Sequence, residues 1–250
     1  MNKEKDVLKE EKKRFIFIII ILGIFLSLIM LLSAANPVGP NSVVSVSNET
    51  KSSTTSAAFF NISGGYIAAL NLSATIQNTR WKAFVGWVNG KFTLDDAGGA
   101  TIYDWTLSVT TGRVYSTRDG STIEWASIAC ADRATNLKTE EINMFHTNNS
   151  GDNITKTFQM GTHNPFWVAG HSFSANQCPT LNTYIGNVSQ DTDFEEMALY
   201  DSTSIIYATI LENDLAGYDG QTYDFQMLVP ENGSQGFTGA TPYYLYVELD

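Results

Sequence analysis

The chain has 250 residues, of which 15 are basic and 26 acidic, so its net charge is −11. Six basic and four acidic residues precede Phe15, which leaves 9 basic and 22 acidic residues and a net charge of −13 for the remainder. This acidity argues against nucleic acid as a partner, because such binding depends on basic side chains that neutralise phosphates. The length suffices for one large all-β domain or two small ones.

Residues 15–32 form an apolar run that only Gly23 and Ser27 interrupt, directly after the basic cluster 12–14. This pattern predicts a membrane-inserted helix whose N-terminal end stays in the cytoplasm. Eighteen helical residues reach about 27 Å, and residues 33–35 complete a span of roughly 30 Å. The small residues at 33–35 also suit a signal peptidase. Residues 15–35 are therefore either a retained anchor or a cleaved signal peptide, and residues 1–14 a cytoplasmic tail.

Residues 36–57 are rich in Ser, Thr, Asn and Pro, a composition typical of a flexible stalk. Val43, Val44 and Val46 leave an alternative open. They could form an extended segment that pairs with the open sheet edge of a neighbouring subunit, as donor strands do, and the protein would then be a filament subunit. The exported domain proper is expected to span residues 58–250.

Strand and turn signals dominate this domain. Residues 66–76 alternate, with Leu70, Leu72 and Ile76 on one side, and predict a strand. Residues 81–88 predict another, which Asn89-Gly90 should join to residues 91–94 through a type I′ hairpin. Further strands are expected at 101–109, 113–117, 154–160, 194–200, 204–211, 221–229 and 243–249. The short spacing predicts antiparallel sheets, because no alternation of strands with helices is present.

One short helix is expected between residues 131 and 145. Thr139 can cap it, and Glu140 and Glu141 suit its first turn, where the helix dipole favours negative charge. Ile142 and Phe145 would then face the core.

Cys130 and Cys178 are the only cysteines, and both belong to the exported part. Two thiols in an oxidising compartment predict a structural disulfide, which would stabilise the fold by about 4 kcal/mol according to loop entropy. Asn-x-Ser/Thr triplets support export as acceptors of N-linked glycans. They begin at Asn48, Asn61, Asn71, Asn148, Asn153, Asn187 and Asn232.

The sequence signals for metal-binding and catalytic sites are weaker than those for export. The three histidines, His146, His163 and His171, match no known zinc spacing, so isolated structural histidines are the simpler interpretation. Carboxylates on loops offer a weak calcium site, because calcium prefers oxygen ligands. Its candidates are Asp191, Asp193, Asp214 and Asp219. The pattern predicts no catalytic residue and no cofactor, although sequence spacing cannot place paired carboxylates across a sugar.

The five tryptophans allow either core packing or sugar stacking on an exposed face. They are Trp81, Trp87, Trp105, Trp125 and Trp167. The period-2 spacing of the first pair suits the inner face of a sheet at least as well as a glycan-binding surface.

The arrangement of aromatics and turns resembles an uncharacterised family of archaeal exported cell-surface proteins. The similarity lies in residues 81–94, 101–105, 112–115, 125–130, 194–200 and 224–231. This resemblance implies an exported archaeal protein and carries no catalytic residue with it.

Together these observations predict an all-β fold, an antiparallel β-sandwich with a jelly-roll as one form of it, preceded by the N-terminal apolar helix. The expected function is that of a cell-surface or secreted glycoprotein with a structural or adhesive role and no catalysis. Its expected partners are the membrane, through residues 15–35, and other surface proteins, itself or glycans. A filament subunit and a carbohydrate-active module, either glycan-binding or glycoside-cleaving, are the alternatives.

Overall fold

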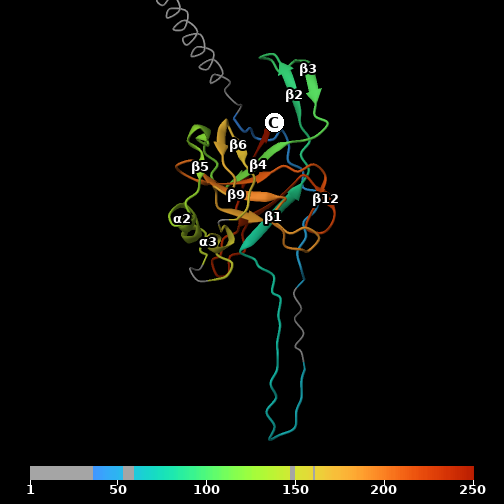
Figure 1. Ribbon diagram of the computed structural model, residues 1–250, viewed down its shortest axis with the longest axis vertical. Coiled ribbons are helices and arrows are strands. Elements are labelled where there is room, and N and C mark those ends of the chain that lie inside the picture. Colours follow the sequence, from blue (N-terminus) through green and yellow to red (C-terminus); the bar gives the residue numbers. More distant parts are fainter. Residues whose placement is uncertain (1–35, 53–58, 147–149, 160) are drawn as a thin grey trace, which may run out of the picture.

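The computed structural model describes residues 36–52, 59–146, 150–159 and 161–250. Within these residues no helix is both long and apolar enough to cross a membrane. The predicted anchor or signal segment, 15–35, and the acceptor Asn148 lie outside the described residues. The described part is mostly antiparallel β-strands with few helices, as the sequence predicts (Figure 1).

A six-stranded antiparallel sheet forms the centre of the described residues. Its strands lie in the order β14-β4-β10-β9, and β5 and β8 both pair with the outer edge of β9. The bounds are β4 Gly112–Thr117, β5 Ala129–Cys130, β8 Thr180–Asn182, β9 Glu195–Tyr200, β10 Ile205–Ile210 and β14 Tyr244–Leu249.

Both faces of this sheet are covered, so nearly every residue of β4, β9 and β10 is buried. On one face, Val114 and Tyr207 pack with Met227 and Val229 of β13 and with residues of the two short helices. On the other face, Tyr115 packs with a second cluster. That cluster includes Trp125 of the turn η1 (Trp125–Ser127) and residues of the hairpin β6 (Phe166–Val168) and β7 (His171–Phe173).

The first strand, β1 (Trp81–Gly86), pairs with β13 (Phe225–Pro230) and not with the segment that follows it. The predicted Asn89-Gly90 hairpin is therefore wrong. Neither residue has the positive φ that a type I′ turn requires. Gly90 instead lies against Leu249, where an added Cβ would come within 2.3 Å of the leucine side chain. The glycine serves a close approach of two segments, and a sequence pattern cannot distinguish this use from a turn.

Besides the 3₁₀ helix η1, two short α-helices lie among the described residues, α2 (Asn136–Asn143) and α3 (Ile154–Thr157). The predicted helix exists, but it begins before Thr139, whose hydroxyl donates to the Thr135 carbonyl from inside the helix. Its buried side carries Leu137, while Ile142 and Phe145 are exposed, contrary to expectation.

The segment predicted as a strand at 154–160 begins with α3. Asn153 caps this helix by accepting a hydrogen bond from the Lys156 amide at 2.9 Å. The cap favours a helical turn over the extended backbone that the β-branched residues suggested.

The predicted disulfide is present, with the Cα atoms of Cys130 and Cys178 4.9 Å apart. Cys130 ends β5, and Cys178 precedes β8. The Ala198 amide donates to the Pro179 carbonyl, and the Ala198 carbonyl accepts from the Ala131 amide. The bridge thus joins two short segments that lie end to end along β9 and together act as one edge strand.

The last strand, β14, pairs with β4 on one side, and on its other side Val38 and Val247 exchange two backbone hydrogen bonds. Arg113 adds a bidentate contact to Asp250, at 2.6 and 2.7 Å. These contacts hold the final residues against the sheet. Strands β11 (Leu215–Ala216) and β12 (Thr222–Tyr223) form a small separate pair.

Two segments leave this body at opposite ends of its long axis (Figure 1). One is the hairpin β2 (Lys91–Asp95) and β3 (Thr101–Thr106), whose turn is closed by a hydrogen bond from the Gly99 amide to the Asp96 carbonyl. The other, here called the arm, comprises residues 59–79. It is exposed throughout and contains no strand, although its alternation predicts one at 66–76.

Candidate functional site

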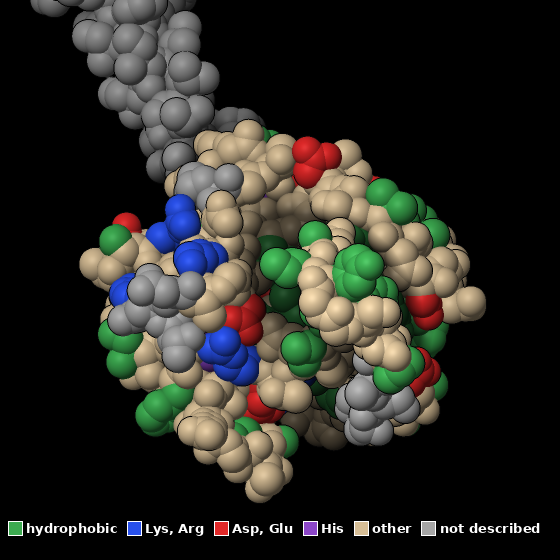
Figure 2. All heavy atoms as spheres, turned by 90° about the horizontal axis from the view of Figure 1, so that it is seen from below, with side chains coloured by type: hydrophobic (Ala, Val, Ile, Leu, Met, Phe, Trp, Pro, Cys, Tyr) green, Lys and Arg blue, Asp and Glu red, His purple; other side chains and the backbone are tan. Residues whose placement is uncertain are grey.

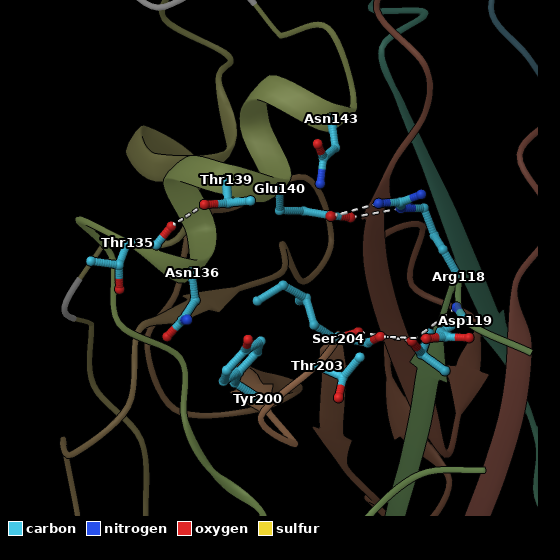
Figure 3. A pocket seen from close by; sticks show the side chains of 12 residues that line it. Arg118, Asp119, Thr135, Asn136, Thr139, Glu140, Asn143, Tyr200, Thr203 and Ser204 are labelled. Carbon is cyan, nitrogen blue, oxygen red and sulfur yellow. Dashed lines mark hydrogen bonds and ion pairs between the residues drawn. The ribbon is translucent and has the colours of Figure 1, made fainter. Parts of the chain in front are cut away.

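A polar pocket of about 420 Å³ opens between the end of β4, the helix α2 and the turn from β9 to β10 (Figure 3). Its lining is dominated by hydroxyl and amide groups. The lining residues are Thr117, Arg118, Asp119, Thr135, Asn136, Thr139, Glu140, Asn143, Tyr200, Thr203, Ser204 and Ile205.

The charged groups of the pocket already have partners. Arg118 donates to both carboxylate oxygens of Glu140, from Nε at 2.7 Å and from an Nη at 2.6 Å. This hydrogen bond raises the pKa of Arg118 above its ordinary value. The Ser204 hydroxyl donates to Asp119 at 2.6 Å and lowers the pKa of that carboxyl. Figure 3 shows the Arg118–Glu140 pair beside α2 and the Asp119–Ser204 pair below it.

This arrangement suits binding better than glycoside cleavage. A glycosidase needs a carboxylic acid whose raised pKa lets it protonate the leaving oxygen. Of the two carboxylates here, Asp119 has a lowered pKa, and both oxygens of Glu140 accept from Arg118. Hydroxyl and amide groups beside one tyrosine ring are the groups that a sugar or another polyol can use.

The histidines have structural roles in two of three cases. His146 and His163 are buried, whereas His171, on β7, is exposed. His163 Nε2 accepts from the Cys178 amide at 2.9 Å, so its Nδ1 donates to the Asn164 carbonyl at 2.8 Å. The ring therefore supports the backbone beside the disulfide. His146 Nε2 contacts the Glu231 carbonyl at 3.0 Å.

The predicted calcium candidates do not gather. Within the described ranges, no three His, Cys, Asp or Glu side chains are placed to hold a metal ion. Asp191, Asp214 and Asp219 are exposed, and Asp193 is half-buried. Asp219 accepts hydrogen bonds from the Gln221 amide and the Tyr223 hydroxyl.

Three glutamates near β9 have raised pKa values. Burial raises the pKa of Glu195 and of Glu212, and nearby acidic side chains add to the effect. Glu196 is fully buried, and burial raises its pKa well above the ordinary value. One of its oxygens accepts from the Leu228 amide at 2.7 Å and so bridges β9 to β13.

The tryptophans divide between core and surface. Trp125 is buried, and Trp81 packs against the core cluster that contains Phe158. The other three, in different segments of the chain, are about half exposed. Trp87 lies beside Tyr223, Trp105 beside Tyr103 on β3, and Trp167 is in β6. Core packing thus accounts for only part of the set.

The glycan acceptors differ in accessibility. Asn48, Asn61, Asn71 and Asn187 are exposed, and Asn232 is half-buried. Asn153 is 1% exposed because it caps α3. A glycan on Asn153 would require that cap to open.

The arm is the most exposed apolar segment that the structure describes. Ile67 is 101% exposed, Leu72 83% and Ile76 86%. No charged residue occurs between Lys51 and Arg80. Figure 2 looks at the molecule from the end where the arm projects, and hydrophobic side chains lie open on the surface nearest the viewer.

No protein-family model matches the chain, and comparisons with curated proteins and with solved structures find no match either. The polar pocket was not foreseen, because its lining residues come from three segments that only the fold unites. The arm was visible in the sequence as an alternating segment, but its lack of a partner strand was not.

Proposed function

We propose that this chain is an exported structural protein of the cell surface, either anchored by residues 15–35 or secreted, and that it acts by association and not by catalysis. The disulfide supports this proposal, because such bridges persist in oxidising compartments. The exposed acceptors Asn48, Asn61, Asn71 and Asn187 fit glycosylation outside the cytoplasm. The β-rich body, with β1 and β13 laid against the central sheet, supports the proposed description as a β-sandwich.

The observation that carries the proposal is the arm. Its alternating apolar side chains match a half-buried strand, yet every residue from 59 to 79 is exposed. Soluble proteins seldom leave a large apolar segment open unless it meets another surface. An association role explains this exposure, and it favours an assembling surface protein, including the filament subunit, over an isolated enzyme.

A second candidate function is glycan binding at the pocket between β4 and α2. Its hydroxyl and amide lining supports this, and so does the ring of Tyr200 in the same lining. This function is compatible with the first, since an adhesive surface protein needs a ligand site.

Export can be tested with the full chain carrying one tag before Met1 and another after Asp250. Protease added to intact cells should remove the C-terminal tag and leave the N-terminal tag of an anchored chain protected. Lysed cells serve as the control, in which both tags are cleaved. A C-terminal tag that resists protease until lysis would contradict export.

Glycan binding can be tested by titrating the purified chain with soluble oligosaccharides prepared from cell-surface glycans. Asn143→Ala, in the pocket lining, should weaken binding about tenfold, as expected for loss of a hydrogen bond to a ligand. Asn213→Ala, on an exposed loop outside the pocket, is the matched control and should leave binding unchanged. Equal affinities of both variants would exclude the pocket as the site.

A further inference from the structure

We propose that the arm of one copy docks on the apolar face of the β2–β3 hairpin of a second copy, head to tail. This inference rests on the proposed role in association and names the partner as the chain itself. Both halves of the contact are present in every molecule, which is the condition for self-assembly.

The apolar side of the arm is formed by alternate residues. Leu70, Leu72, Ala74 and Ile76 lie on one side of an extended backbone, and polar residues lie between them. In the described residues none of the four is buried and no strand pairs with this segment. The segment therefore has the pattern of a strand that packs on an apolar surface, without that surface in its own fold.

The β2–β3 hairpin likewise has an apolar face that nothing in the described part of its own fold covers. Phe92 pairs with Trp105 and Leu94 with Tyr103, so these four side chains share one face. All residues of β2 and β3 are exposed. Among the described strands none joins them as a third, and a two-stranded hairpin alone is marginally stable in water.

The opposite face of the hairpin is mostly polar, with Ile102 as its one large apolar side chain. Lys91 and Asp104 form an ion pair at 2.7 Å there, and Thr93 lies on the same side. The face with four large apolar side chains therefore gains more from docking than the opposite face, which has only Ile102. Face-to-face contact buries both apolar sets at once, whereas addition of the arm to the hairpin edge would leave Phe92 and Trp105 in water.

A second copy is favoured over a foreign partner because one chain carries both apolar surfaces that lack a partner among the described residues, the arm and the hairpin. Two exported domains of net charge −13 repel each other, and the contact avoids further repulsion because residues 52–79 carry no charge. The arm and the hairpin lie at opposite ends of the long axis (Figure 1). Docking between them joins unlike surfaces head to tail, so the contact repeats from copy to copy and builds an open filament or a closed ring, depending on the rotation between neighbours.

Cross-linking between two differently substituted full chains tests this directly. A chain with Ala74→Cys is mixed with a chain with Leu94→Cys, and a short bismaleimide is added; the native cysteines are engaged in the disulfide. The matched control pair is Thr75→Cys with Thr93→Cys, the adjacent positions on the polar sides. We expect the apolar pair to give at least a fivefold higher yield of heterodimer. No heterodimer, or equal yields from both pairs, would overturn face-to-face docking.

A charge placed on either side of the arm gives an independent test. Leu72→Asp should reduce the assembled fraction at least tenfold in sedimentation and electron microscopy, whereas Thr75→Asp should assemble normally. Leu72→Asp keeps the Asn71 acceptor triplet, and both residues are exposed, so the thermal unfolding of both variants should match the parent. Assembly of Leu72→Asp equal to that of Thr75→Asp would overturn the proposal. Neither result depends on export, which the tag experiment tests separately.

Discussion

The central sheet and the arm are both rich in apolar side chains, but only the sheet buries them. Strand β10 is covered on two faces, and Ile206, Tyr207 and Ala208 are fully buried. In the arm, Leu72 and Ile76 stay open to water. The difference shows that an apolar sequence pattern predicts only that one side of a segment is buried against other apolar residues. Whether those residues belong to the same chain or to another molecule depends on the fold.

The largest expected effect comes from truncating to alanine an apolar side chain that packs on the central sheet, compared with one in the arm. Phe158 is fully buried, and its ring contacts Trp81 and Tyr207 at centroid distances of 6.4 and 5.4 Å. Phe158→Ala should lower the free energy of unfolding by about 3–5 kcal/mol, because it leaves a cavity. Ile67→Ala, in the arm, should change it by less than about 0.5 kcal/mol. Denaturant titration of both variants checks the contrast, and a large loss for Ile67→Ala would mean that the arm packs on its own body.

Loss of the disulfide should have the next largest effect. The double variant Cys130→Ala/Cys178→Ala frees the two segments that β9 holds end to end. The bridge closes a loop with a sequence separation of 48, so its removal should cost about 2–4 kcal/mol. Unfolding with and without reductant measures this cost. Reductant should destabilise the parent chain and leave the variant unaffected; equal responses would contradict the assignment.

Replacement of Glu196 tests the pH dependence of the buried core. Its pKa is raised by burial, so the folded chain keeps a proton that the unfolded chain loses. The stabilising contribution is complete below the ordinary pKa and is lost as the pH rises through the folded value.

Glu196→Gln keeps an oxygen for the Leu228 amide and removes the titration. It should raise the free energy of unfolding at pH 8 by about 1–3 kcal/mol and change it little at pH 4. Unfolding at both pH values measures the difference, with exposed Glu124→Gln as the control. Equal effects at the two pH values would show that Glu196 does not titrate as proposed.

The smallest effect is expected where the chain covers the outer edge of β14. Val38→Pro removes the amide that donates to the Val247 carbonyl at 3.0 Å, and should cost about 1 kcal/mol. Val38→Ala keeps the amide and is the control, since the Val38 side chain is exposed. Hydrogen exchange of the Val247 amide should speed up only in the proline variant. Unchanged exchange would indicate that the edge is held by other contacts.

Much of the fold class was predictable because it depends on local patterns. Alternation, β-branched residues and turns indicated antiparallel strands, and the cysteine count indicated the disulfide. The partner of β1 was not predictable, because residues 225–230 are far away in sequence and Asn89-Gly90 mimics a hairpin turn. The pocket was equally hidden, since Arg118, Glu140 and Ser204 come from three segments that are far apart in sequence.

The sequence by itself determined the acidity, the apolar N-terminal run, the β-rich character and the pairing of Cys130 with Cys178, because composition and short-range spacing specify these properties. Only the tertiary structure decided which apolar segments are buried. Burial depends on which distant segments meet, and for residues 66–76 none does within the described chain. The physical reason is that the hydrophobic effect is non-directional. An apolar pattern therefore predicts that a segment is buried, but it does not specify which segment or molecule buries it.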